Sequence, residues 1–134
     1  MPWVRLCDIP DAPEEGRLDA YRVGRTPVAL LRHDGELRAY LNLCTHAYGT
    51  FNAECLKDGI LTCPLHHARF DATDGRVLAG PAKERLGRLS LAEREGIVEV
   101  LVPRPLLEPG VIGKLVARIT RNRAPGWPTV KKMG

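Results

Sequence analysis

The 134-residue chain has no apolar run approaching the roughly 20 residues that cross a membrane, and no charged start followed by an apolar segment. Aromatic residues make up only 5% of it. These absences argue against a membrane span and a secretory signal, and we expect a cytoplasmic protein. Nucleic-acid binding is also disfavoured, because the body of the chain has no basic stripe with interleaved aromatic residues.

Charge is spread unevenly along the chain. Residues 1–102 carry 13 Lys and Arg against 15 Asp and Glu, whereas residues 103–134 carry 7 against 1. The basic character therefore belongs to the last part of the chain. We treat residues 1–102 as one domain, as expected for this length, and residues 103–134 as a basic C-terminal extension.

Short alternating apolar runs separated by glycine and proline predict an all-β fold of small antiparallel sheets. Asp34-Gly35, between apolar runs at 28–33 and 37–43, predicts a hairpin with a type I′ turn, which needs positive φ at both turn residues. Apolar and polar residues alternate over 37–43, so we expect one buried face there. Further strands are expected at 3–6, 20–23, 60–62, 69–71, 76–78, 86–91 and 97–102.

The C-terminal extension contains apolar residues at helical spacing: Val111, Ile112, Leu115, Val116 and Ile119. We therefore expect a short C-terminal helix, which either packs on the sheets with a solvated basic face or docks an acidic redox partner. Proline and glycine follow it, so a loosely ordered tail is expected over 123–134.

Cysteine and histidine gather in two short motifs. Cys44-Thr45-His46 and Cys63-Pro64-Leu65-His66 form C-x-H and C-x-x-H pairs, separated by residues 47–62. Two thiolates and two imidazoles make a soft, mixed site that suits zinc or iron–sulfur. Each loop supplies one of each type, so a loop can give its thiolate to one iron and its imidazole to another. The candidate metal ligands are Cys44, His46, Cys63 and His66.

This arrangement resembles the Rieske [2Fe–2S] proteins, in which two Cys hold one iron and two His hold the other. The resemblance extends to Phe70-Asp71 and Gly75, and to Gly80-Pro81-Ala82, which resembles the family's proline loop over the cluster. It implies one Rieske-type [2Fe–2S] cluster per chain, and a Rieske fold whose cluster-binding subdomain has its loops within residues 44–82.

The resemblance also implies a function. A protein of this kind is a soluble one-electron carrier, monomeric when free, that passes electrons from a flavin-containing reductase to a terminal oxygenase of the ring-hydroxylating dioxygenase type. It is not itself an enzyme. Only His33 and His67 remain after the cluster ligands, so we expect no second iron site with two His and one carboxylate.

Three alternatives remain open at this point. The chain could be the electron-transfer subunit of another redox enzyme, such as a monooxygenase or a nitrite reductase. It could be held permanently in a larger complex through its basic extension. A structural zinc module with a binding role would use the same two thiolates and two imidazoles.

The reduction potential is also predicted from the resemblance. Rieske proteins of respiratory cytochrome complexes have an extra Cys in each ligand loop, and a Ser and a Tyr after the second His. Without hydroxyl donors to sulfur the reduced cluster is less stabilised, so we expect a potential at the low end of the Rieske range, near about −150 mV. The matching residues here are Gly49, Leu65, Ala68 and Phe70.

Three other residues compete for roles at the site. His67 stands where the family usually has glycine, and the spacing favours His66 as the ligand. Cys7 and Cys55 lie outside the two motifs, and we expect them to be ordinary, partly buried thiols.

Overall fold

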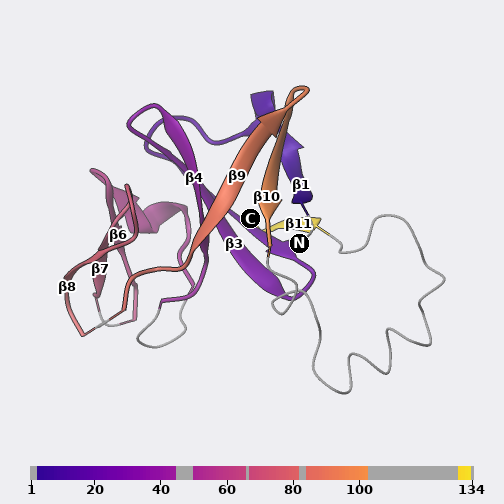
Figure 1. Cartoon of the computed structure of the whole chain (residues 1–134). Helices are drawn as coiled ribbons and strands as arrows, with labels where there is room; N and C mark the ends of the chain where they lie inside the picture. Colours follow the sequence, from indigo (N-terminus) through magenta and orange to yellow (C-terminus); the bar gives the residue numbers. More distant parts are fainter. Residues whose placement is uncertain (1–2, 45–49, 66, 82–83, 103–129, 134) are drawn as a thin grey trace, which may run out of the picture.

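The computed structural model describes residues 3–44, 50–65, 67–81, 84–102 and 130–133, which form two antiparallel sheets (Figure 1). The large sheet has the strand order β1-β10-β9-β4-β3-β2-β11, and the small sheet has the order β5-β6-β7-β8. The strands are β1 (Trp3–Asp8), β2 (Leu18–Val23), β3 (Thr26–His33), β4 (Glu36–Leu41), β5 (Leu56–Lys57), β6 (Ile60–Thr62), β7 (Arg69–Asp71), β8 (Val77–Ala79), β9 (Arg88–Arg94), β10 (Ile97–Leu101) and β11 (Val130–Met133).

Two short 3₁₀ helices, η1 (Ile9–Asp11) and η2 (Ala53–Cys55), complete the described elements. The expected all-β fold of small antiparallel sheets is confirmed. None of the helices in the described part of the chain has the length and apolar character needed to span a membrane. The expected C-terminal helix falls within residues 103–129, outside the described residues.

The expected β3–β4 hairpin forms around a type I′ turn. Asp34 and Gly35 have φ values of 55° and 79°, and His33 pairs with Glu36 across the turn. The Glu15 carboxylate accepts hydrogen bonds from the backbone N–H groups of both turn residues, at 2.8 Å each. These bonds lower the pKa of Glu15. A local sequence signal and a distant carboxylate therefore hold the same turn.

The expectation of a single buried face on β4 is wrong. Arg38, Tyr40 and Asn42 have exposed fractions of only 8%, 0% and 3%. Ala39, on the opposite face, packs in an apolar cluster inside the large sheet. Both faces are covered because the small sheet packs against the polar side of this strand.

Hydrogen bonds from β4 join the two sheets. The Tyr40 hydroxyl donates to the Ala72 carbonyl at 2.7 Å, and Arg38 Nη1 donates to the Thr73 carbonyl at 2.9 Å. Arg38 Nε is buried and has no hydrogen-bond partner among the described residues. The turn after β7 is therefore held by two side chains of the large sheet.

The expectation of a loosely ordered tail is wrong for residues 130–133. These residues form β11, which pairs antiparallel with β2 from Val130 opposite Val23 to Met133 opposite Ala20. Val130 packs against the apolar cluster of the large sheet, and Lys132 Nζ lies 3.5 Å from Asp19 Oδ2. The last strand of the chain thus covers what would otherwise be the open edge of β2.

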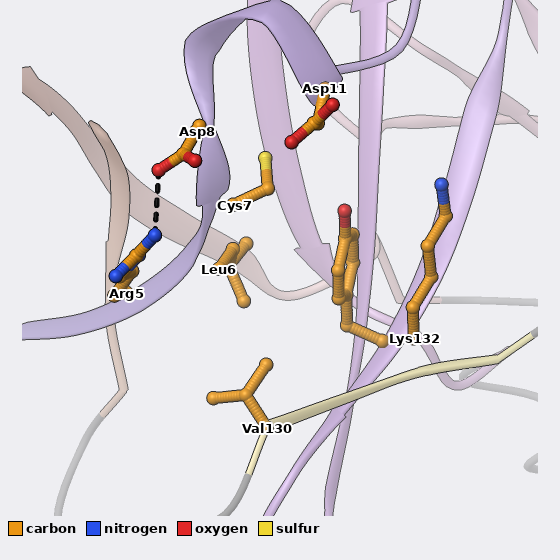
Figure 2. Close-up of a pocket in the computed structure, with 8 residues that line it drawn as sticks. Arg5, Leu6, Cys7, Asp8, Asp11, Val130 and Lys132 are labelled. Carbon is orange, nitrogen blue, oxygen red and sulfur yellow. Dashed lines mark hydrogen bonds and ion pairs between the residues drawn. The ribbon is translucent and has the colours of Figure 1, made fainter. Parts of the chain in front are cut away.

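The large sheet curls until its edge strands β1 and β11 line one surface hollow of about 540 Å³ (Figures 1 and 2). Figure 2 shows Arg5, Leu6 and Cys7 of β1 on one side, and Val130 and Lys132 of β11 on the other. Burial raises the pKa of the Cys7 thiol, so this cysteine stays protonated at neutral pH. The expectation that Cys7 is an ordinary, partly buried thiol is confirmed.

Candidate metal centre

The two cysteines of the motifs are buried together. Cys44 follows β4 by a few residues, and Cys63 comes directly after β6. Both have an exposed fraction of 0%, and both belong to the apolar cluster between the two sheets. All four cysteines lie in the described part of the chain, and none forms a disulfide. Both side chains are soft sulfur donors of the kind that a mixed metal site uses.

The two histidines of the motifs, His46 and His66, lie outside the described residues. Among the residues that are described, no three Cys, His, Asp or Glu side chains gather to hold a metal ion. The structure therefore places the two thiols of the four-ligand set, and the full set stays a prediction.

The first ligand loop is closed by a side chain. The amide of Asn42 donates from Nδ2 to the Phe51 carbonyl at 3.0 Å, and its Oδ1 accepts from the Phe51 N–H at 2.7 Å. These two residues flank residues 43–50, which contain Cys44. Sequence reasoning missed Asn42, because a polar residue in an alternating strand is usually solvated.

The second ligand loop is a tight turn closed by backbone bonds. The Cys63 N–H donates to the Ala68 carbonyl at 2.7 Å, and the His67 N–H donates to the Cys63 carbonyl at 3.0 Å. Gly80 lies against this turn: a Cβ added to Gly80 would stand 2.6 Å from the Ala68 Cα. Gly80, the first residue of the expected proline loop, therefore packs against Ala68, where the second ligand loop ends.

The feet of the two loops touch through aromatic rings. Phe51 ends the first loop and Phe70 follows the second, and their rings meet edge to face with centroids 5.9 Å apart. Both side chains are at most 2% exposed. Edge-to-face pairs are favourable beyond the area they bury, so this contact fixes one loop relative to the other.

His67 occupies a strained position. Its φ is +59°, in the left-handed region that L-residues disfavour, and its side chain is exposed. This explains why a glycine suits the position after the second histidine. The sequence showed the departure from glycine but not its conformational cost.

Cys55 completes the capping box of η2, in which Asn52 is the N-cap residue. Its thiol donates to Asn52 Oδ1 at 3.4 Å, and its Sγ accepts from the Asn52 N–H at 3.3 Å. Burial raises the pKa of the Cys55 thiol. Cys55 is outside any disulfide, and it is buried rather than partly buried as expected.

The residues present fit a metal centre of the sequence-predicted kind. Two fully buried thiols stand at the feet of adjoining loops, and each loop carries one further histidine in its motif. Ala68 and Phe70, both fully buried, surround the second foot without a hydroxyl group. A cluster held here would have soft donors and an apolar lining.

Comparison with protein families gives a match to one model. The model described as "Rieske [2Fe-2S] domain" matches residues 2–98. The matched region contains both cysteine–histidine motifs and the strands that carry them.

Curated relatives are ferredoxin components of oxygenase systems. The ferredoxin component of the naphthalene 1,2-dioxygenase/salicylate 5-hydroxylase systems of a Ralstonia species is 34% identical over 79 residues, which cover 59% of this chain and 75% of that protein. The 3-phenylpropionate/cinnamic acid dioxygenase ferredoxin subunit of Photorhabdus laumondii is 30% identical over 104 residues, which cover 76% of this chain and 96% of that protein.

Solved structures with the same fold include ferredoxins as well as parts of larger oxygenases. The Sphingomonas yanoikuyae B1 ferredoxin is 27% identical, with a TM-score of 0.66, and the match covers 76% of this chain and all of that one. The ferredoxin in a complex of reduced oxygenase and oxidised ferredoxin of carbazole 1,9a-dioxygenase is 26% identical, with a TM-score of 0.62. That match covers 73% of this chain and 91% of that chain.

Proposed function

We propose that this chain, which belongs to the Rieske [2Fe–2S] domain family, is the ferredoxin of an oxygenase system and passes single electrons from a flavin-containing reductase to a terminal oxygenase. The observation that carries the proposal is the joint burial of Cys44 and Cys63 at the feet of two loops. It occurs in a chain whose matches cover nearly the whole length of proteins named as ferredoxins or ferredoxin subunits.

The chain's own residues would hold the cluster. Cys44 and Cys63 would ligate one iron as thiolates, and His46 and His66 would ligate the other. When bound, the cluster supplies a site that takes up and releases one electron. A structural zinc module is not supported, because the matching family is a [2Fe–2S] domain.

The lining of the site favours a low potential. Ala68 and Phe70 stand where the Rieske proteins of respiratory cytochrome complexes have hydroxyl donors, and neither side chain can donate a hydrogen bond to sulfur. Fewer donors leave the more negative, reduced cluster less stabilised, so we infer a potential near about −150 mV. Such a carrier gives up its electron readily.

Exposed apolar side chains lie beside the second ligand loop. Leu65 is 55% exposed and sits within the loop, while Leu78 is 43% exposed and lies on β8, next to the strand that follows the loop. Large exposed apolar side chains mark contact surfaces. We infer that an oxygenase docks over this end of the small sheet, which keeps the distance for electron transfer short.

The chain would not catalyse oxygenation itself. His33 and His67 are the histidines left after the proposed ligands, and they lie on different elements. His33 ends β3 and packs over Gly59, with Nδ1 4.0 Å from Glu15 Oε2. The oxygen chemistry is therefore assigned to the partner. The four cysteines outside disulfides fit a reducing compartment, and the cytoplasm is part of the proposal.

The proposal is tested by EPR and redox titration of the protein reduced with dithionite. A Rieske signal, with a potential near about −150 mV, is expected. The ligand set is tested by paired variants: His66→Ala should lose the cluster, whereas His67→Ala should keep it. Loss of the cluster in His67→Ala alone would overturn the assignment, and the absence of a Rieske signal in the wild type would overturn the function.

A further inference from the structure

Asn42 is a buried polar side chain whose bonds all serve one loop. It is 3% exposed, and its amide uses both ends on the backbone of Phe51, as donor at 3.0 Å and as acceptor at 2.7 Å. Its own N–H donates to the Pro27 carbonyl at 2.9 Å, which anchors it to β3. A buried amide that is satisfied in this way holds its partners in one arrangement, because any shift leaves a polar group unpaired.

The loop that this amide closes is the first ligand loop. Residues 43–50 lie between the two bonded residues and include Cys44 and the C-x-H motif. The amide thus acts as a side-chain replacement for a pair of strand hydrogen bonds. It holds Phe51 just before η2, which leads into β5, the first strand of the small sheet.

Phe51 passes this constraint to the second ligand loop. Its ring stands edge-on to Phe70, with an interplanar angle of 89° and centroids 5.9 Å apart. Phe70 lies on β7, two residues after Ala68, whose carbonyl accepts the Cys63 N–H. A continuous set of buried contacts therefore runs from the amide to the foot of the second loop.

We propose that Asn42 is the positioning residue that sets the first ligand loop against the second, so that the geometry of the metal centre depends on this amide. The inference rests on the proposed function, since the loops matter through the cluster they hold. Asn42 acts through the backbone of Phe51.

The test compares full-length, cluster-loaded Asn42→Ala and Asn42→Asp with the wild type. Alanine removes both bonds to Phe51, whereas aspartate has the same shape and keeps the acceptor for the Phe51 N–H but cannot donate to the Phe51 carbonyl. Either change opens the paired closure, so both variants should show the effects below. We expect cluster release to a chelator to be about 10–100-fold faster in both, as for other residues that support metal ligands. The EPR g-values of the reduced cluster should also shift.

Asn52→Ala is the matched control. Asn52 is exposed and lies directly after Phe51, and its side chain caps η2 by accepting from the Glu54 N–H at 2.9 Å. Its removal should leave release rate and EPR spectrum unchanged. If the Asn42 variants do not accumulate with a cluster, Phe51→Leu keeps both backbone bonds, removes the ring contact and should show the same two changes.

The outcomes separate the two proposals. Wild-type release rates and spectra in the Asn42 variants, even with a lower Tm, would overturn the positioning role and leave the function intact. If Phe51→Leu has to be used instead, a wild-type release rate and EPR spectrum in that variant would also overturn the positioning role. A wild-type protein without a Rieske signal would instead overturn the proposed function.

Discussion

Replacing His67 with glycine should make the protein more stable. Four non-glycine residues in the described part of the chain have positive φ, and three of them, Asp34, Asp58 and Glu95, each precede a glycine in a two-residue hairpin turn. His67 is the exception, at +59° in the turn between Cys63 and Ala68. Its exposed side chain contributes little packing that glycine would lose.

The size of the effect follows from two opposing quantities. The left-handed conformation costs a non-glycine residue about 1–2 kcal/mol, and glycine removes this cost. Glycine also has more conformational freedom in the unfolded chain, and losing it on folding lowers the free energy of unfolding by about 0.5–1 kcal/mol. The midpoints of these two ranges leave a net gain of about 0.8 kcal/mol, or roughly 3–5 °C in Tm for a domain of this size.

Thermal unfolding of the cluster-loaded protein measures this gain, and EPR follows the cluster. Glu95→Gly is the matched control, since it relieves the same kind of conformation, at +51°, in the β9–β10 turn. Both variants should gain stability and keep the wild-type spectrum. A lower Tm for His67→Gly with a higher one for Glu95→Gly would refute the strain reasoning, and a changed spectrum would show that His67 contributes to the metal centre.

Three further perturbations probe the supporting structure. Gly80→Ala should lower the free energy of unfolding in urea by about 2–4 kcal/mol, because the added Cβ would stand 2.6 Å from the Ala68 Cα. Gly16→Ala is the control: its Cβ would have nothing within 4 Å, so the loss should be about 1 kcal/mol. Equal losses in the two variants would contradict this reasoning. Burial raises the pKa of Tyr40 to about 12, so the free energy of unfolding should be constant below about pH 10 and decrease as the pH rises towards 12. Tyr40→Phe should make this decrease smaller, and it should lower the free energy of unfolding by about 1 kcal/mol at pH 7 through the lost hydrogen bond. A variant with the same alkaline decrease as the wild type would contradict this. Deleting residues 130–134 should lower stability by about 1–2 kcal/mol and cause association through the freed edge of β2, and sedimentation of a stable monomer would argue against this role.

Much of the fold could be read from local signals. Asp34-Gly35, Asp58-Gly59 and Glu95-Gly96 each turn with positive φ at both residues, as a type I′ turn requires. The strands on either side of these turns were expected within a few residues of their observed ends, except β5, which was not expected. Local sequence suffices here because the backbone conformation of a two-residue turn depends on the two residues themselves.

The polar face of β4 was misjudged for a different reason. Alternation shows which residues share a face, but it does not show what lies over that face. Arg38, Tyr40 and Asn42 are buried because segments later in the chain pack on them. The turn after β7 accepts hydrogen bonds from the side chains of Arg38 and Tyr40, and Phe51 accepts one from Asn42. The strand β11 was missed likewise, since an edge strand of four residues depends on the neighbour that it pairs with.

The sequence by itself determined the donor chemistry of this protein. The identity and spacing of Cys44, His46, Cys63 and His66 select a soft, mixed site, because coordination depends first on which atoms can donate. Only the tertiary structure decided how that site is supported. The Asn42 bonds to Phe51 and the Phe51 contact with Phe70 join residues that carry no metal-binding signal, and they exist because the fold brings together segments that are separate in the chain.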